Sequence, residues 1–322
     1  MNRREFVTLA GAMIARSCPV RAQEAGRIYR LGFLVPAVRE EPAIAAFFDE
    51  LRLAGFIEGQ NLNVVPNGFD VRNDQLAERA AAVVRAAPDA IASGPSLHTR
   101  ALQQLTQSIP LVTITEDMVA EKLAASLARP GGNTTGISLL SPELDGKRQE
   151  ILIEAVPRVQ RIAALADSNI TRPEHLQTLQ DAARTRGVTL SVYGVGKSDE
   201  IVPAMDKAKA SGAEALNVLA TPLFLTHQRA ITDRAATLRL PAIYQWPHMA
   251  EQGGLLAYGP RFEQVHRQRA RMVIKILRGA KPAEVPVEQP TLFELVINLQ
   301  AAKAIGHEIP LALVQRADKV VE

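Results

Sequence analysis

The sequence has little that could support reactive chemistry. One cysteine, Cys18, occurs in 322 residues, so an internal disulfide is excluded. If Cys18 is removed with an N-terminal segment, thiol catalysis and cysteine-bound metals are excluded as well. Beyond the N-terminus no apolar run is long enough to cross a bilayer. Aromatic residues are few, with nine Phe, four Tyr and one Trp, so any place where they gather is informative.

The N-terminus predicts an export signal. Arg3-Arg4 precede a short apolar run, and Ala22 ends an A-x-A-like cleavage motif. We therefore expect segment 1–22 to be a twin-arginine-type signal peptide and the protein to act outside the cytoplasm. Lipid attachment at Cys18 is a less favoured alternative, because Arg and Ser precede it where small apolar residues are needed.

The overall basic charge belongs largely to this segment. The whole chain has 37 Lys and Arg against 34 Asp and Glu, and removal of segment 1–22 leaves 33 of each. A basic surface is the main electrostatic indication of nucleic-acid binding. The mature chain lacks that indication, so no nucleic-acid partner is expected.

Glycine-rich segments suggest a nucleotide site, but the required patterns are absent. The stretch RPGGNTTGIS (129–138) lacks both G-x-G-x-x-G and a closing Gly-Lys-Ser/Thr, and its β-branched end predicts a strand. In YGVGKSDE (193–200), Ser191 stands where a phosphate loop needs its first glycine, so Ser198 is interpreted as a helix N-cap. No zinc-helix histidine pair and no nucleophile elbow occur. We therefore expect no catalytic residue, no metal and no cofactor.

Strands and helices alternate twice along the chain in the same order. A buried strand over 29–37 is followed by a helix over 43–54, and much later a strand over 161–169 is followed by a helix that Pro173 opens. Each half then repeats strand-to-turn segments, which lie at 89–96, 109–117, 214–224 and 240–246. This alternation predicts an α/β protein with two parallel-sheet lobes. Ligands bind beyond the carboxyl ends of such strands, so we expect the turns to face one cleft.

Two further segments follow the second lobe. A helix is predicted over 262–277, and its apolar positions are Val265, Ala270, Met272, Val273 and Ile276. A last strand and helix are predicted over 293–306.

Four strand-end turns have side chains suited to a ligand. Ser96, with the first N–H groups of the helix that follows it, suits a carboxylate, and a structural cap is the alternative. Glu116 and Asp117 could accept an ammonium group or cap a helix. The segment Tyr244-Gln245-Trp246 and Phe224 form a candidate aromatic wall for a planar solute, or else pack beneath a loop.

Four long motifs resemble those of a known family. They are GGNTTGIS (131–138), GGLLAYGPRF (253–262), ILRGAKPAEVPVEQPTLFELVINLQAAKAIG (276–306) and RADKVVE (316–322). The chain resembles the ABC-transporter substrate-binding proteins of the branch that includes tryptophan- and tyrosine-binding receptors. The resemblance implies the type I periplasmic-binding fold, with two Rossmann-like parallel-sheet lobes joined by a three-crossover hinge. It places 23–139 plus 260–288 in lobe 1 and 140–259 plus 289–322 in lobe 2.

The resemblance also implies that strand-end turns of both lobes contact the ligand. Carried over position by position, the contacts are Ser93, Gly94, Pro95, Ser96, Glu116 and Asp117 in lobe 1 and Asp167, Ser168, Asn169, Thr221, Pro222, Phe224, Tyr244 and Gln245 in lobe 2. Members of the family commonly have Asp where Thr221 stands and Glu where Gln245 stands. Both changes remove a negative charge that could pair with an α-ammonium group, and an unpaired buried charge is costly.

The function that the resemblance implies is solute capture without catalysis. We expect a periplasmic receptor that binds a small aromatic or branched amino acid, or a related carboxylate, and that delivers it to an ABC permease with its ATPase. The alternative is an extracytoplasmic sensor subunit of a signalling system. An α/β hydrolase is a weaker alternative, because the sequence has no motif for a nucleophile.

Overall fold

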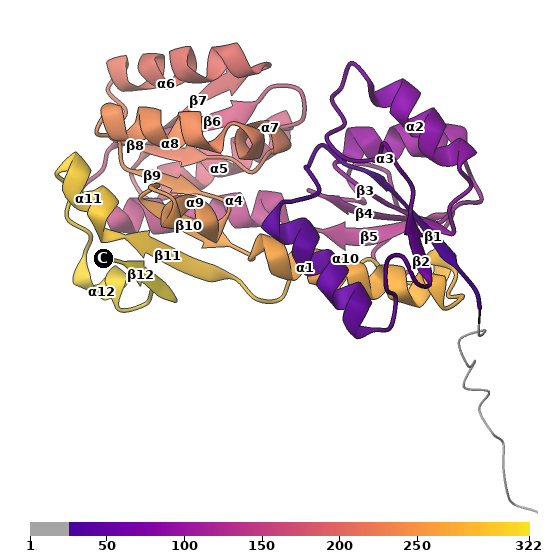
Figure 1. The fold of residues 1–322 in the computed structure, drawn as a ribbon. Coiled ribbons are helices and arrows are strands. Elements are labelled where there is room, and N and C mark those ends of the chain that lie inside the picture. The colour runs from indigo at the N-terminus through magenta and orange to yellow at the C-terminus, as the bar shows by residue number, and fades with distance from the viewer. Residues whose placement is uncertain (1–25) are drawn as a thin grey trace, which may run out of the picture.

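The computed structural model describes residues 26–322, so the predicted export segment 1–22 and Cys18 lie outside the described residues. Two β-sheets lie side by side, and the chain crosses between them three times (Figure 1). None of the helices formed by residues 26–322 combines the length and the apolar character that a membrane span requires.

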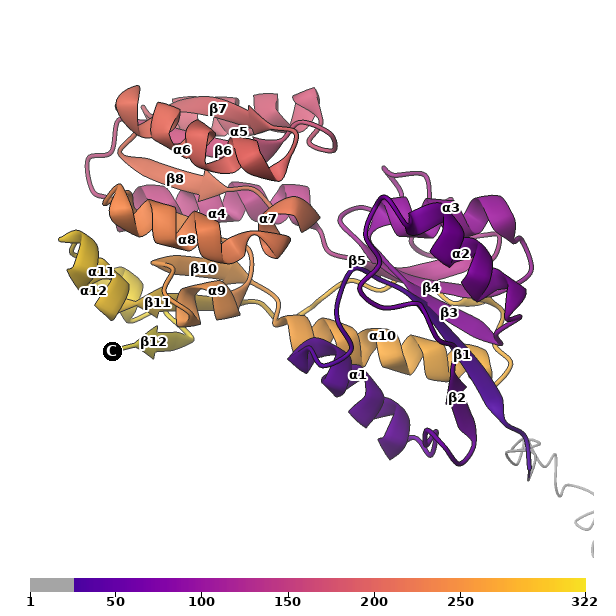
Figure 2. The ribbon, with the colours of Figure 1, turned by 45° about the horizontal axis from the view of Figure 1, so that its top comes forward.

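The first sheet has five parallel strands in the order β2-β1-β3-β4-β5. Helices α2 and α3 cover one face, and α1 and α10 cover the other (Figure 2). The strands are β1 (Tyr29–Leu34), β2 (Leu62–Val64), β3 (Ala90–Ser93), β4 (Leu111–Thr115) and β5 (Thr134–Ser138). The helices are α1 (Pro42–Leu53), α2 (Leu76–Arg85), α3 (Ser96–Leu105) and α10 (Phe262–Leu277).

The second sheet has seven strands in the order β12-β11-β10-β9-β8-β6-β7, and only β10 and β11 pair antiparallel. Its strands are β6 (Arg161–Asp167), β7 (Thr189–Val195), β8 (Ala215–Val218), β9 (Ala242–Tyr244), β10 (Leu256–Gly259), β11 (Glu294–Asn298) and β12 (Lys319–Val321). Its helices are α4 (Ser141–Ala155), α5 (Pro173–Thr185), α6 (Ile201–Ala210), α7 (Pro222–Thr226), α8 (Gln228–Thr237), α9 (Pro247–Glu251), α11 (Leu299–Ile305) and α12 (Leu311–Val314). Two short 3₁₀ turns are η1 (Ser198–Glu200) and η2 (Pro282–Glu284).

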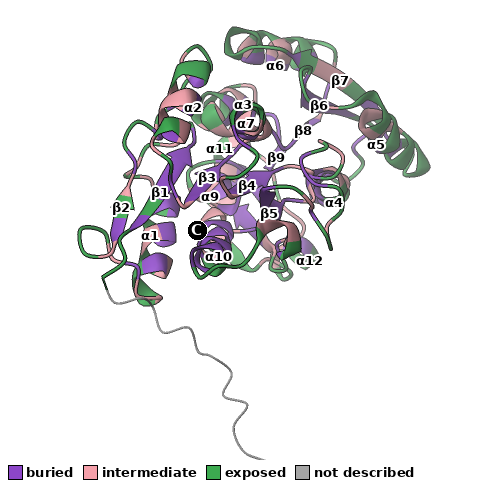
Figure 3. Ribbon diagram, turned by 90° about the vertical axis from the view of Figure 1, so that its right-hand side faces the viewer, coloured by how far each residue is buried: buried purple, intermediate pink, exposed green. Residues whose placement is uncertain are grey.

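The predicted alternation of strands and helices is confirmed in both lobes. One local prediction was wrong: Ser198 is the first residue of η1 and makes no capping hydrogen bond, and α6 starts only at Ile201. The strands form the buried centre, while the helices expose their outer faces to solvent (Figure 3).

Helix α10 returns from the second sheet to the first and packs lengthwise against α1 (Figure 2). The five apolar positions predicted for this helix are all buried. Apolar burial of this kind contributes about 25 cal/mol per Å². It therefore fixes α10 to the lobe that contains the N-terminal strands, although in sequence the helix lies between β10 and β11 of the second sheet.

The stretch 129–138 is a turn leading into β5, as the sequence analysis expected. At Gly136 the backbone has a φ of 153°, and an added Cβ would lie 2.0 Å from the carbonyl oxygen of Thr113 in β4. The next residue, Ile137, forms a bridge with Glu288, where the chain crosses between the sheets for the last time. Glycine is thus required here for backbone approach beside a crossover.

We predict that Gly136→Ala destabilises the protein by about 3 kcal/mol or more, because overpacking adds to the cost of a positive φ. Urea unfolding measures this change. The control is Gly132→Ala, where φ is 61° but no atom lies within 4 Å of the added Cβ. That variant should lose about 1–2 kcal/mol. Equal losses in the two variants would contradict the steric argument.

Candidate ligand-binding cleft

A cavity of about 520 Å³ lies where the carboxyl ends of strands from the two sheets face each other. Its size is in the range of small-molecule sites. Seven of the residues that the sequence analysis selected line it: Ser93, Gly94, Pro95, Glu116, Thr221, Pro222 and Gln245. The strand ends of both lobes thus meet at one cavity.

The other selected residues do not line the cavity, and those of the first lobe have partners elsewhere. Ser96 was predicted to face the ligand, with a helix cap as the alternative; in the structure Pro95 holds the cap position and the Ser96 hydroxyl donates to the Glu121 carboxylate. Asp117 accepts a hydrogen bond of 3.0 Å from the Ala120 N–H.

In the second lobe, the turn after β6 is closed on itself. Asp167 accepts from the Asn169 N–H at 2.9 Å, Asn169 donates to the Gly196 carbonyl at 2.8 Å, and Ser168 is exposed. Phe224 and Tyr244 are buried in the core, 2% and 1% exposed, where the Tyr244 ring packs on Gly254. For these two aromatic residues the structure therefore shows the alternative interpretation, packing beneath a loop.

The aromatic wall of the cavity comes from different residues. Trp246, at the start of α9, and Phe262, at the start of α10, both line the cavity, with ring centroids 4.7 Å apart. The Phe262 ring also meets His266 edge-on at 4.6 Å. Trp246 belongs to the aromatic wall predicted from the sequence, whereas Phe262 and His266 were not predicted, because they lie on a helix and not in a turn after a strand.

Arg269, one turn further along α10, also lines the cavity and is 1% exposed. It donates to the Ser93 carbonyl at 3.2 Å and to Nδ1 of His266 at 3.1 Å. Because Nδ1 of His266 is an acceptor, its proton lies on Nε2. Burial lowers the pKa of Arg269 to about 9, and burial together with the Arg269 charge holds the pKa of His266 well below its usual value. At neutral pH the pair is therefore a buried cation beside a neutral imidazole.

Glu116 directly follows β4 and lines the cavity. Burial raises its pKa to about 8, although the hydrogen bond donated by the Ser141 hydroxyl acts in the opposite direction. At pH 7 its carboxyl group is therefore mostly protonated and can donate a hydrogen bond into the cavity that it lines.

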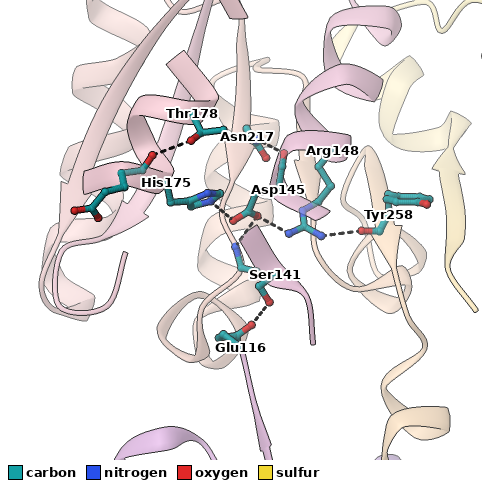
Figure 4. Close-up of polar contacts among 10 residues, drawn as sticks. Glu116, Ser141, Asp145, Arg148, His175, Thr178, Asn217 and Tyr258 are labelled. Carbon is teal, nitrogen blue, oxygen red and sulfur yellow. Dashed lines mark hydrogen bonds and ion pairs between the residues drawn. The ribbon is translucent and has the colours of Figure 1, made fainter. Parts of the chain in front are cut away.

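A buried polar network connects Glu116 to the second lobe through α4 (Figure 4). Asp145 forms a buried ion pair with Arg148, and its carboxylate lies 2.9 Å from Nε2 of His175. Arg148 also donates to the carbonyl of Tyr258 at 3.1 Å. Asp145 Oδ1 accepts from the Ala220 N–H at 3.1 Å. Since Ala220 directly precedes two cavity residues, the Asp145 carboxylate fixes the position of the turn after β8.

The comparisons with known proteins agree with this architecture. A family model described as "ABC transporter substrate binding protein" matches residues 42–321. A curated relative, the tyrosine-binding protein of Clostridioides difficile strain R20291, is 23% identical over 273 residues, which cover 82% of this chain and 76% of that protein.

Solved structures with the same fold cover nearly the whole described chain. A domain from Streptococcus pneumoniae in complex with L-Trp superposes with a TM-score of 0.81 at 21% identity, covering 91% of this chain and 100% of that chain. A conserved domain protein from Vibrio cholerae O1 biovar El Tor N16961 has a TM-score of 0.82 at 25% identity, with the same coverage.

We predict that Asp145→Asn destabilises the protein by about 3–5 kcal/mol in urea unfolding, because Arg148 keeps a buried and unpaired charge. Adding Arg148→Met to this variant should restore much of the loss. Asp181→Asn serves as control, since Asp181 pairs with Arg184 at 2.7 Å on the exposed surface. The control should lose less than about 1 kcal/mol. If Asp145→Asn loses no more than the control, the network does not hold the turn.

We also predict that Glu116→Gln changes how stability depends on pH. The folded protein binds the Glu116 proton more tightly than the unfolded chain, so the free energy of unfolding falls as pH rises from the unfolded pKa, 4.5, toward about 8. The Gln variant lacks this fall. Urea midpoints measured at about pH 5.5 and about pH 8.5 should show wild type losing stability relative to the variant. A difference between the two proteins that is the same at both pH values would contradict the raised pKa.

Proposed function

Since the chain belongs to the ABC transporter substrate-binding protein family, we propose that it is the periplasmic receptor of an importer, which captures a small solute between its lobes and delivers it to a permease with its ATPase. The observation that carries this proposal is the cavity, because both lobes supply its walls. A ligand that contacts both lobes stabilises the closed arrangement over the open one by its extra contacts.

The walls of the cavity favour a small ligand with a flat or branched apolar part. Trp246 and Phe262 form one wall, and Val35, Ile114 and Leu139 add apolar surface. We therefore propose an aromatic or branched amino acid, or a related carboxylate, as the ligand class. The relative named for tyrosine binding and the neighbour solved with L-Trp support a ligand of this size.

The proposed role is binding without catalysis. Ser93 is the serine hydroxyl on the cavity lining, and it shares a hydrogen bond of 3.0 Å with the hydroxyl of Thr99. A threonine hydroxyl is too weak a base to activate a serine. His266 lines the same cavity, but its Nδ1 is occupied by Arg269.

Purified protein, refolded to remove any ligand carried through purification, is first screened by thermal shift against aromatic and branched amino acids and their deaminated acids. A ligand at ~100 times its Kd adds ~2.7 kcal/mol of stability. For the ligand so found, we predict that Phe262→Ala weakens binding about tenfold in calorimetry, since it removes an apolar wall.

Phe293→Ala is the matched control for this experiment. Phe293 is also half-buried, but its ring faces Tyr258 at 6.2 Å and does not line the cavity. The affinity of the Phe293→Ala variant for the ligand should equal that of wild type. A screen without any stabilising compound would overturn the proposed ligand class, and equal affinities of the two variants would place the ligand elsewhere.

A further inference from the structure

Arg269 is a buried cation without a counter-ion in the described part of the chain. Its two hydrogen-bond acceptors, the Ser93 carbonyl and the His266 ring, are both neutral, and its Nε has no acceptor. No carboxylate of residues 26–322 lies within ion-pair distance of its guanidinium. The face of the Phe47 ring, 5.2 Å away, is its remaining electrostatic contact.

Two comparable arginines of this protein, unlike Arg269, have carboxylate partners. Arg148, which is as deeply buried, pairs with Asp145, and the half-buried Arg261 pairs with Glu251 and with Glu294 at 3.0 and 2.7 Å. Leaving a buried charge unpaired costs several kcal/mol, so an unpaired guanidinium in a protein interior needs an explanation. The position of Arg269 on the cavity lining supplies one: its counter-ion is the ligand.

We propose that the ligand is a carboxylate without an α-ammonium group and that its anion pairs with Arg269. This inference rests on the proposed function, because it specifies the ligand class of the same cleft. A guanidinium suits a carboxylate, since the two planar groups can form parallel charge-assisted hydrogen bonds.

Other residues of the lining also have hydrogen-bond donors without an acceptor. Nε2 of Gln245 and Nε1 of Trp246 are buried and have no acceptor among the described residues. Glu116, whose pKa burial raises to about 8, is mostly protonated at neutral pH and adds another donor. A carboxylate offers about four acceptor sites, which suits these donors.

An ammonium group finds fewer partners in the same cavity. Thr221 and Gln245 are neutral, and Glu116 is uncharged at pH 7. The other acidic residues on the lining, Glu41 and Glu263, are more exposed than Arg269, and Glu41 already accepts from the Val38 N–H at 3.1 Å. A solvated carboxylate contributes less to ion pairing than a buried one.

The test uses four compounds that share a phenyl ring: 3-phenylpropanoate, its primary amide, L-phenylalanine and 2-phenylethylamine. Calorimetry at pH 7 on the refolded full chain should show that the acid binds at least about tenfold more tightly than the amide. L-Phenylalanine should bind no more tightly than the acid, and the amine should bind most weakly.

Arg269→Gln and Arg269→Met should each reduce the acid-to-amide preference to within about threefold. If Arg269 had a purely structural role, the substitutions would instead weaken the binding of the acid and of the amide by the same factor. The Met variant removes a buried charge, so its ligand-free form should be at least as stable as wild type in urea. The matched control is Arg267→Gln, on the same helix, where the arginine pairs with Glu50 at 3.8 Å and the preference should not change.

The outcomes separate this inference from the proposed function. If amino acids bind wild type more tightly than the deaminated acids, the receptor function stands and the carboxylate proposal fails. An acid-to-amide preference that persists in both Arg269 variants also overturns the proposal. If none of these compounds binds, nor L-Trp or L-Tyr, the proposed ligand class fails and the carboxylate proposal fails with it.

Discussion

The packing of α10 against α1 is the contact on which the rest of the structure depends. It returns the chain to the first sheet between β10 and β11 of the second sheet, and it does so by burial along almost the whole helix. The same contact places Phe262, His266 and Arg269 beside the carboxyl ends of the strands, where they line the cavity. A single helix therefore fixes the topology of the crossovers and supplies both an aromatic wall and a charge to the site.

Buried charge is distributed unevenly between the lobes, and the difference has a functional meaning. In the second lobe the Asp145–Arg148 pair is complete and holds the turn after β8 through the Ala220 N–H. On the side of the first lobe, Arg269 keeps its hydrogen bonds to neutral groups and has no carboxylate partner among residues 26–322. Compensated charge rigidifies one wall of the cavity, whereas the uncompensated charge is available to a ligand.

Much of the fold could be predicted from the sequence, because hydrophobic period and breaker residues mark the strands and helices in both halves. The resemblance, which takes the family's contacts from strand-end turns, also placed Thr221 and Gln245 at the ligand, and both line the cavity. It misplaced Tyr244, because successive strand residues point to opposite sides and this ring turns into the core. It could not find Arg269, which lies on a helix. The helical spacing nevertheless indicates its position. Residues 262, 266, 269 and 273 share one face of the helix, so polar residues on that face point inward.

The neutral residues at Thr221 and Gln245 and the charge of Arg269 are two parts of one electrostatic arrangement. All three line the same cavity. A carboxylate at position 221 or 245 would place a negative charge on this lining. This charge would compete with an anionic ligand for the guanidinium, and it would also repel the ligand. With a hydroxyl and an amide at these positions, the fully buried charge that residues 26–322 place on the lining is positive. A ligand anion then offsets the desolvation cost of Arg269. The ion pair between the anion and the guanidinium makes the free energy of binding more favourable, because the ligand-free protein has no such pair.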